Sequence, residues 1–203
     1  MSDAVTGDDP RCPWALGSPS MEDYHDTEWG FPVGSDVRLF EKLCLEAFQS
    51  GLSWRTILDK REGFRRAFAG FDPTAVATFG PDDVERLMGD ASIVRNRAKI
   101  EAAIHNAGRY ADLVEQEGSL AAFVWGFEPD PTEVPEPQTM STSPSSTRLA
   151  KELKKRGWRF VGPTTAFAFM QSMGLVNDHV HGCPARATVA DALAAFDRPG
   201  PPS

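Results

Sequence analysis

Apolar residues recur at three- and four-residue intervals along almost the whole chain, and this helical spacing most constrains the fold. Val37, Phe40, Cys44 and Phe48 fall on one face of a helix that Ser35 or Asp36 can cap. Alternating apolar and polar residues, which would indicate half-buried strands, do not occur in any long run. The sequence therefore predicts an all-α protein of one or two lobes.

Further helices are expected over 54–61, with Ser53 as N-cap, and over 81–89, 97–116, 149–158 and 163–175. Residues 128–146 are rich in proline and lack an apolar period, which predicts a long loop. The polar residues 1–10 are expected to be a disordered leader. We expect the helical domain to span 11–184 and residues 185–203 to form a C-terminal tail.

Composition narrows the class of protein. The formal net charge is −8 at pH 7, which argues against a nonspecific polyanion binder but leaves room for a local basic face. No run of about 20 apolar residues is present, and the acidic start MSDAVTGDDP is unlike a signal peptide. The scattered cysteines do not form a disulfide framework. We expect a cytoplasmic protein with no membrane partner.

Cysteine and histidine residues at the two ends of the chain form the first candidate site. His179 and Cys183 are four residues apart and share a face if that segment is helical. Cys12 and His25 would complete a Cys2His2 set, which suits zinc. On residue types alone, a buried Cys12, a hydrogen-bonded His25 and an exposed His179 are an equally good interpretation.

The segment LCLEAFQSGLSW (43–54) contains the second candidate site. Glu46 shares a helical stripe with Leu39 and Leu43, so its carboxylate lies on an apolar flank where burial would raise its pKa. Trp54 follows a glycine-containing turn and could face the same cavity. The alternative, which the residues alone favour, is that Glu46 is a surface carboxylate and Trp54 a core residue.

The segment RLMGDASIVRNRAKI (86–100) reads as a helix, a short turn and a second helix. Backbone N–H groups at such a turn can bind a phosphate, and Arg95, Arg97 and Lys99 follow it closely. The alternative is that these cations lie on an ordinary solvated helix face.

Several motifs in order resemble the 3-methyladenine DNA glycosylase I family of helix-hairpin-helix enzymes, over roughly residues 11–184: RCPW (11–14), YHDTEWGFP (24–32), LFEKLCLEAFQSGLSWRTIL (39–58), DASIVRNRAKI (90–100), KKRGWRFVGPTT (154–165) and MQSMGLVNDHVHGC (170–183). The resemblance implies two helical lobes with a helix-hairpin-helix at about 81–110. It also implies one structural zinc that joins the N- and C-terminal segments through Cys12, His25, His179 and Cys183.

The implied activity is hydrolysis of the N-glycosidic bond of 3-methyladenine in double-stranded DNA, which leaves an abasic site and the free base. The family pocket maps onto Tyr24, Trp54 and Trp14, with Met21 where a second tyrosine is usual, and Glu46 is the expected catalytic residue. No lysine is expected as a nucleophile in this pocket, so the enzyme should be monofunctional.

The resemblance also implies a DNA-binding surface. Leu52 is the candidate wedge, and the hairpin contributes Ser92, Arg95, Arg97 and Lys99. Family hairpins commonly carry glycine at the position of Ser92, and a positive φ there would cost about 1 kcal/mol.

Two other functions are compatible with these residues. One is a non-catalytic reader of damaged or single-stranded DNA, suggested by the change to Met21. The other is a zinc-clipped helical scaffold that binds a protein partner through the loop 128–146. We expect a monomer in each case.

Overall fold

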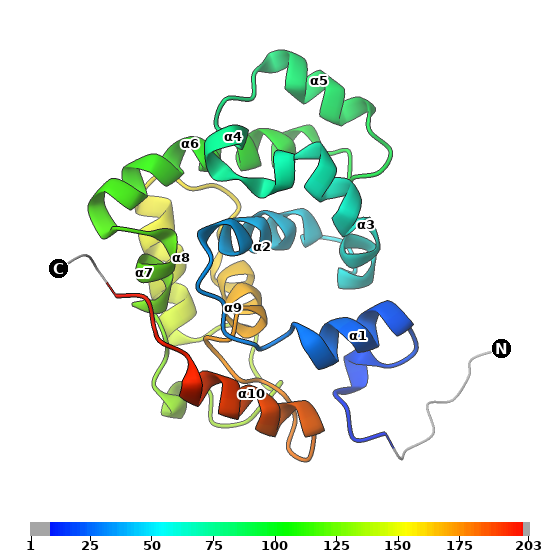
Figure 1. Ribbon diagram of the computed structural model, residues 1–203, viewed down its shortest axis with the longest axis vertical. Helices are drawn as coiled ribbons and strands as arrows, with labels where there is room; N and C mark the ends of the chain where they lie inside the picture. Colours follow the sequence, from blue (N-terminus) through cyan, green and yellow to red (C-terminus); the bar gives the residue numbers. More distant parts are fainter. Residues whose placement is uncertain (1–8, 201–203) are drawn as a thin grey trace.

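The computed structural model describes residues 9–200, and every regular element in that range is helical, as predicted (Figure 1). The α-helices are α1 (Pro19–Thr27), α2 (Asp36–Gln49), α3 (Trp54–Ala67), α4 (Pro73–Val76), α5 (Pro81–Gly89), α6 (Arg97–Glu117), α7 (Leu120–Trp125), α8 (Pro144–Lys155), α9 (Pro163–Ser172) and α10 (Pro184–Ala195). Short 3-10 turns lie at Pro13–Ala15, Ala69–Phe71 and Pro131–Glu133. None of the helices within residues 9–200 combines the length and hydropathy that a bilayer-spanning segment requires.

Helix α2 lies at the centre of the molecule, with α3 to α6 on one side and α1, α9 and α10 on the other (Figure 1). Because neighbours cover it on both sides, nearly its whole circumference is buried, including Leu39, Phe40 and Phe48. Each such side chain contributes about 1.5–3 kcal/mol by leaving water. The fully covered helix explains how charged residues of α2 come to be buried beside the core.

Local capping fixes several helix starts. Ser53 Oγ accepts from the backbone N–H of Thr56 at the start of α3, as predicted. At the start of α2 the N-cap residue is Ser35, and its hydroxyl makes no capping bond. The Asp36 carboxylate instead accepts from the backbone N–H groups of Leu120 and Ala121, at 3.0 and 2.8 Å. Asp36 thereby ties the start of α2 to the start of α7.

The C-terminal segment differs from the prediction. Residues 185–203 were expected to be a tail outside the domain, but helix α10 spans Pro184–Ala195 and buries Val189 completely. Its proline at the first helical position and its alanine-rich sequence favour a helix. Of the expected leader, residues 1–8 lie outside the described residues.

The predicted loop 128–146 is anchored to the rest of the protein. Helix α8 begins within it, at Pro144, and the backbone N–H of Ser145 donates to Glu133 Oε2 at 2.8 Å. Further back, the backbone N–H of Gln138 donates to Asp178 Oδ1 at 2.9 Å. Asp178 also accepts from the side chain of Gln171 on α9, at 2.6 Å. The loop therefore helps to hold one wall of the cavity described below, to which Gln171 belongs.

Helices α5 and α6 form the predicted helix-hairpin-helix, with residues 90–96 as its turn. The turn rests on α3, where a Cβ atom added to Gly63 would lie 2.5 Å from the carbonyl oxygen of Ser92. Ser92 does not have the positive φ that would cause strain there, because positive φ among non-glycine residues of the described range is confined to Ala69, Phe71, Gln138 and Phe160. This close contact requires a residue without a Cβ atom at Gly63 of α3, and it makes no such requirement of Ser92.

Candidate active site and metal centre

A cavity of about 340 Å³ opens between α1, α2, α3 and α9. It brings together every residue that the sequence predicts for the base pocket and the catalytic position: Trp14, Met21, Tyr24, Glu46 and Trp54. Side chains that the sequence did not single out complete the lining: Trp29, Gln49, Ser53, Arg55, Ala168 and Gln171.

Aromatic rings form the walls of this cavity. The centroids of Tyr24 and Trp54 are 5.3 Å apart, and those of Trp14 and Trp29 are 4.9 Å apart in an edge-on arrangement. Met21 precedes Tyr24 by three residues on α1 and so shares its face of the helix. Flat π-surfaces of this kind bind a planar base by stacking, which contributes about 1–3 kcal/mol per base.

Glu46 lies on the buried flank of α2 with 6% of its surface exposed. Burial raises the pKa of its carboxyl, as the sequence predicts, and the ammonium of Lys42 opposes that rise. Lys42 Nζ lies 3.1 Å from Glu46 Oε1 and donates to the hydroxyl oxygen of Tyr24 at 2.6 Å. The same ammonium sits 3.4 Å from the ring centroid of Trp54.

Lys42 is the functional candidate that sequence reasoning missed. The sequence shows Lys42 four residues before Glu46 on a predicted helix, but ion pairs at this spacing usually lie on a solvated face. Here neighbouring helices cover the pair, and Lys42 is only 4% exposed. The prediction that no lysine serves as a nucleophile stays a prediction, although a lysine does lie against the pocket wall.

The turn between α2 and α3 presents Leu52 to solvent, with 42% of its surface exposed. The backbone N–H of Leu52 donates to the carbonyl of Gln49 at 2.6 Å, which tightens the turn. Lys99 differs from its predicted role as a DNA contact. Its buried ammonium donates to the carbonyls of Phe48 and Ser50, at 2.9 and 2.6 Å, and so braces this turn from α6.

The remaining predicted hairpin residues lie where a ligand could reach them. Arg95 and Arg97 are exposed at the turn and at the first residue of α6. Arg97 donates to both carboxylate oxygens of Glu85, at 2.8 and 3.0 Å. The backbone N–H of Ser92 donates to Asp90 Oδ1, which shapes the turn. Arg95 and Arg97 are thus two exposed cations at the turn of this hairpin, and Arg97 is already paired with Glu85.

The structure brings the four predicted metal ligands into one buried cluster. The candidate ligand atoms of Cys12, His25, His179 and Cys183 all lie within 4.8 Å of one another. Nδ1 of His179 lies 3.1 Å from Nε2 of His25 and 3.6 and 3.7 Å from the two sulfurs. Atoms bound at 2.0–2.3 Å around a tetrahedral zinc are about 3.3–3.8 Å apart, which is close to the separations of 3.1 to 3.7 Å from His179.

Hydrogen bonds orient both histidines of the cluster toward its centre. Nδ1 of His25 bonds Asp26 Oδ1 at 2.7 Å, and Nε2 of His179 bonds the carbonyl of Trp29 at 3.0 Å. Each bond requires a proton on the outer nitrogen, which leaves the inner nitrogen of each ring unprotonated, as a metal ligand must be. Burial lowers the pKa of His179 to about 4, which keeps its ring neutral, as a ligand must be.

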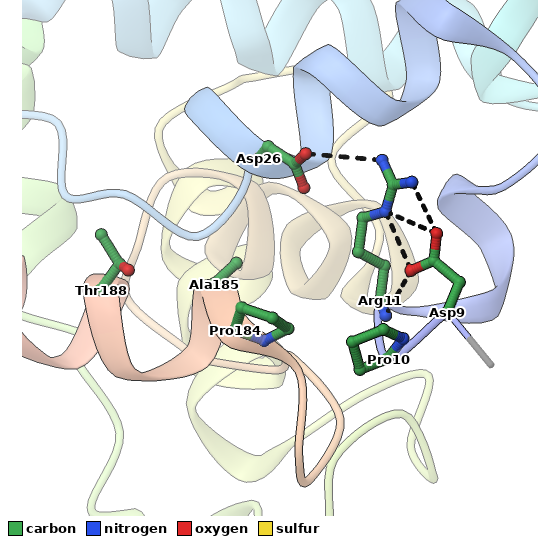
Figure 2. A pocket seen from close by; sticks show the side chains of 7 residues that line it. All are labelled: Asp9, Pro10, Arg11, Asp26, Pro184, Ala185 and Thr188. Atoms are coloured by element: carbon green, nitrogen blue, oxygen red, sulfur yellow. Dashed lines mark hydrogen bonds and ion pairs between the residues drawn. The ribbon is translucent and has the colours of Figure 1, made fainter.

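A larger surface hollow of about 660 Å³ lies beside this cluster, between the N-terminal segment and the start of α10 (Figure 2). Arg11 bonds both carboxylate oxygens of the nearby Asp9 and reaches Asp26 at 3.5 Å (Figure 2). The same guanidinium also pairs with Glu22 at 3.1 Å, so one positive charge faces three carboxylates. These ion pairs hold the first described residues beside the cluster.

Comparison with known proteins finds relatives along most of this chain. The family model for methyladenine glycosylase matches residues 14–187. DNA-3-methyladenine glycosylase 1 of Escherichia coli (strain K12) is 48% identical over 85% of this chain and 95% of its own length. The DNA-3-methyladenine glycosylase of Haemophilus influenzae (strain ATCC 51907 / DSM 11121 / KW20 / Rd) is 43% identical over 88% of this chain and 98% of its own.

A solved structure gives the same result for the fold. The 3-methyladenine DNA glycosylase I of Staphylococcus aureus, solved to define how it recognises 3-methyladenine, aligns with a TM-score of 0.79 and 33% identity. The alignment covers 86% of this chain and 95% of that one. With a family model over most of its residues and relatives this similar along nearly their full lengths, the chain belongs to the methyladenine glycosylase family.

Proposed function

We propose that this chain excises 3-methyladenine from alkylated DNA by hydrolysing its N-glycosidic bond, which leaves an abasic site. The observation that carries the proposal is an aromatic cavity with a buried carboxylate, placed directly beside an exposed leucine turn. The relatives named as DNA-3-methyladenine glycosylases support the same reaction. The substrate is therefore double-stranded DNA, and the free base is the first product.

The reaction asks for little proton transfer to the leaving group. Methylation at N3 leaves a positive charge on the adenine, so the C1′–N9 bond breaks with its electrons moving onto the base. Water then bonds to C1′ and releases a proton. The protein must chiefly extract the base and hold it, and a damaged base unstacks at lower cost than an intact one.

Five residues of the cavity hold that base. Tyr24 and Trp54 stack on it, with Trp14 and Met21 closing the pocket. Glu46, the one carboxylate of the lining within residues 9–200, accepts a hydrogen bond from the exocyclic amine. We assign Glu46 as the catalytic residue, because a negative charge there also stabilises the positive charge that builds up on the sugar.

Leu52 fills the space that the extruded base leaves in the duplex. Its position on the turn that follows α2 puts it next to the cavity, because Gln49, Ser53 and Trp54 of the same turn line that cavity. The hairpin binds a backbone phosphate through its turn and through Arg95 and Arg97.

We infer that the Cys2His2 cluster holds one structural zinc. The spacing of the ligand atoms and the orientation of both histidines support this metal. It would staple the segment before α1 to the start of α10 and take no part in bond cleavage. Metal analysis of protein purified without chelator should give one zinc per chain, and a content far below one would overturn the inference.

The test of the activity is base release from methylated duplex DNA, with products separated by chromatography. We expect release of 3-methyladenine while 7-methylguanine stays in place. The variant E46Q should lose excision by about 10²-fold or more, whereas E62Q, an exposed carboxylate on α3, should match the parent. No release from folded, metal-loaded protein would refute the activity and favour a non-catalytic reader. Unchanged excision in E46Q would remove Glu46 from the mechanism.

A further inference from the structure

A buried lysine lies against the wall of the base cavity and takes part in none of the steps above. Lys42 stands one helical turn before Glu46 on α2, and 4% of its surface is exposed. Its ammonium makes three contacts with residues of the cavity: Glu46 Oε1 at 3.1 Å, the Tyr24 hydroxyl at 2.6 Å, and the face of Trp54 at 3.4 Å from the centroid.

Lys42 lies behind the cavity wall and not inside the cavity. It lines a separate polar void of about 20 Å³, and it is absent from the lining of the larger cavity. Tyr24 and Trp54 border both spaces, so their rings separate the ammonium from any bound base. From this side Lys42 can act on the pocket only through Glu46, Tyr24 and Trp54.

We propose that Lys42 is a positioning residue for base excision, which keeps the Glu46 carboxylate ionised and fixed in direction while it braces Tyr24 and Trp54 from behind. This inference rests on the proposed glycosylase function and assigns it a second charged residue.

The first argument is electrostatic. A carboxyl group buried among aromatic rings would take up a proton, and a protonated Glu46 would lose the negative charge that complements the base. The neighbouring cations cannot replace Lys42. Arg61 of α3 donates hydrogen bonds from both of its terminal nitrogens to Glu28, each at 2.7 Å. Arg55 is exposed and lies 3.8 Å from Asp59.

The second argument concerns the rings. An ammonium on the rear face of Trp54 draws the π-electrons toward that face, which weakens any attraction of the front face for a cationic base. Trp54 therefore binds the base by stacking, and the charge complement comes from Glu46. This differs from a pocket in which the aromatic faces themselves select the cation.

The test uses a double-mutant cycle of K42M, E46Q and the combined variant, with K42R as the conservative change. The control is K151M, which removes an exposed lysine on α8. The measurements are the affinity for free 3-methyladenine, single-turnover excision across pH, and the pKa of the Glu46 carboxyl by carbon NMR.

If Lys42 acts through Glu46, K42M should raise the pKa of Glu46 and reduce excision at pH 7 about tenfold or more. The acidic limbs of the two pH profiles, one for base affinity and one for single-turnover excision, should both move to higher pH. The same change in an E46Q background should have little effect. K42R should restore most of the loss. If K42M does not fold, the parent protein still provides a measurement. Its affinity for free 3-methyladenine must fall at low pH with an apparent pKa equal to that of Glu46.

Three results would overturn the inference. The first is an unchanged pKa of Glu46 in K42M, and the second is an equal loss of excision from K42M with and without Glu46. The third is a borohydride-trapped covalent complex with abasic DNA that K42M abolishes. The last result would make Lys42 a nucleophile. In each case the parent protein still releases 3-methyladenine, which separates this failure from a failure of the proposed function.

Discussion

Gly63 allows the turn between α5 and α6 to pack closely against α3. A Cβ at this position would meet the carbonyl oxygen and the hydroxyl of Ser92 at 2.5 and 2.8 Å, far inside contact distance. The backbone of the turn cannot move away freely, because Lys60 donates to the carbonyl of the preceding residue, Ala91, at 2.8 Å.

We therefore expect G63A to destabilise the protein by about 1–3 kcal/mol, despite the higher helix propensity of alanine. For a chain of this size the melting temperature should fall by about 2–4 °C per kcal/mol. The control is G89A at the end of α5, where an added Cβ meets nothing within 4 Å. Equal melting temperatures for the two variants would show that the hairpin can shift without cost.

At the metal cluster, the residue that matters beyond the ligands is Asp26. Its carboxylate fixes the proton of His25 on the outer nitrogen. Removing it in D26A should lower zinc affinity about 10- to 100-fold, because the ring loses its orientation and some of its basicity. Competition with a chromophoric chelator measures this. D23A, which removes an exposed carboxylate from the same helix, should bind zinc like the parent, and equal affinity in D26A would contradict the role.

At the scale of elements, Lys99 joins the hairpin to the turn that carries Leu52. From the first turn of α6, its ammonium bonds the carbonyls of Phe48 in α2 and of Ser50 just after it, so this turn and the hairpin helix are held as one unit. K99M should leave two carbonyls without their donor and loosen the turn that carries Leu52.

The expected result for K99M is a loss of excision from duplex DNA several-fold greater than any loss of affinity for free 3-methyladenine, since the wedge acts only on DNA. K154M on the exposed face of α8 is the matched control. If both quantities fall together, Lys99 supports the cavity and not the wedge.

The sequence predicts which segments are helical, but it does not predict which neighbours cover each helix. Proline starts, serine caps and apolar spacing place α5 and α6 within one residue of their predicted limits and α3 at its predicted start, because these are local effects. Helix α3 continues to Ala67, six residues beyond its predicted end. Helix α10 was missed although Pro184 and its alanines favour a helix, because its apolar face is short. The sequence predicts Lys99 as a DNA contact, and only the packing of α6 against α2 shows that it is buried.

The residues of the cavity also divide into those that the sequence predicts and those that only the fold reveals. The predicted base-pocket residues and Glu46 come from the first 54 residues and were grouped by motif. Ala168 and Gln171 come from α9, more than 100 residues further along the chain, and no spacing rule relates them to α1. Lys42 requires knowledge of which faces of α2 are covered, which depends on the whole fold.

At the scale of the whole molecule, a chain with a net charge of −8 must bind a polyanion. Many of its arginines are neutralised by carboxylates, as Arg61 is by Glu28 and Arg156 is by Glu117 and Glu152. We therefore expect attraction to DNA to come from exposed cations that lie near the hairpin, such as Arg95. Such a protein should bind undamaged DNA weakly, and its affinity should depend on salt less steeply than that of a basic protein.

The variant R95A tests this charge distribution. Loss of one phosphate contact should weaken binding to damaged and undamaged duplexes by a similar factor, because phosphate contacts carry no sequence information. The slope of log K against log salt concentration should become shallower by about 0.9. K151A is the control, since α8 lies on the opposite side of α2 from the hairpin turn (Figure 1). An unchanged slope in R95A would place the phosphate contacts elsewhere, whereas a loss confined to damaged DNA would mean that Arg95 acts on the extruded nucleotide.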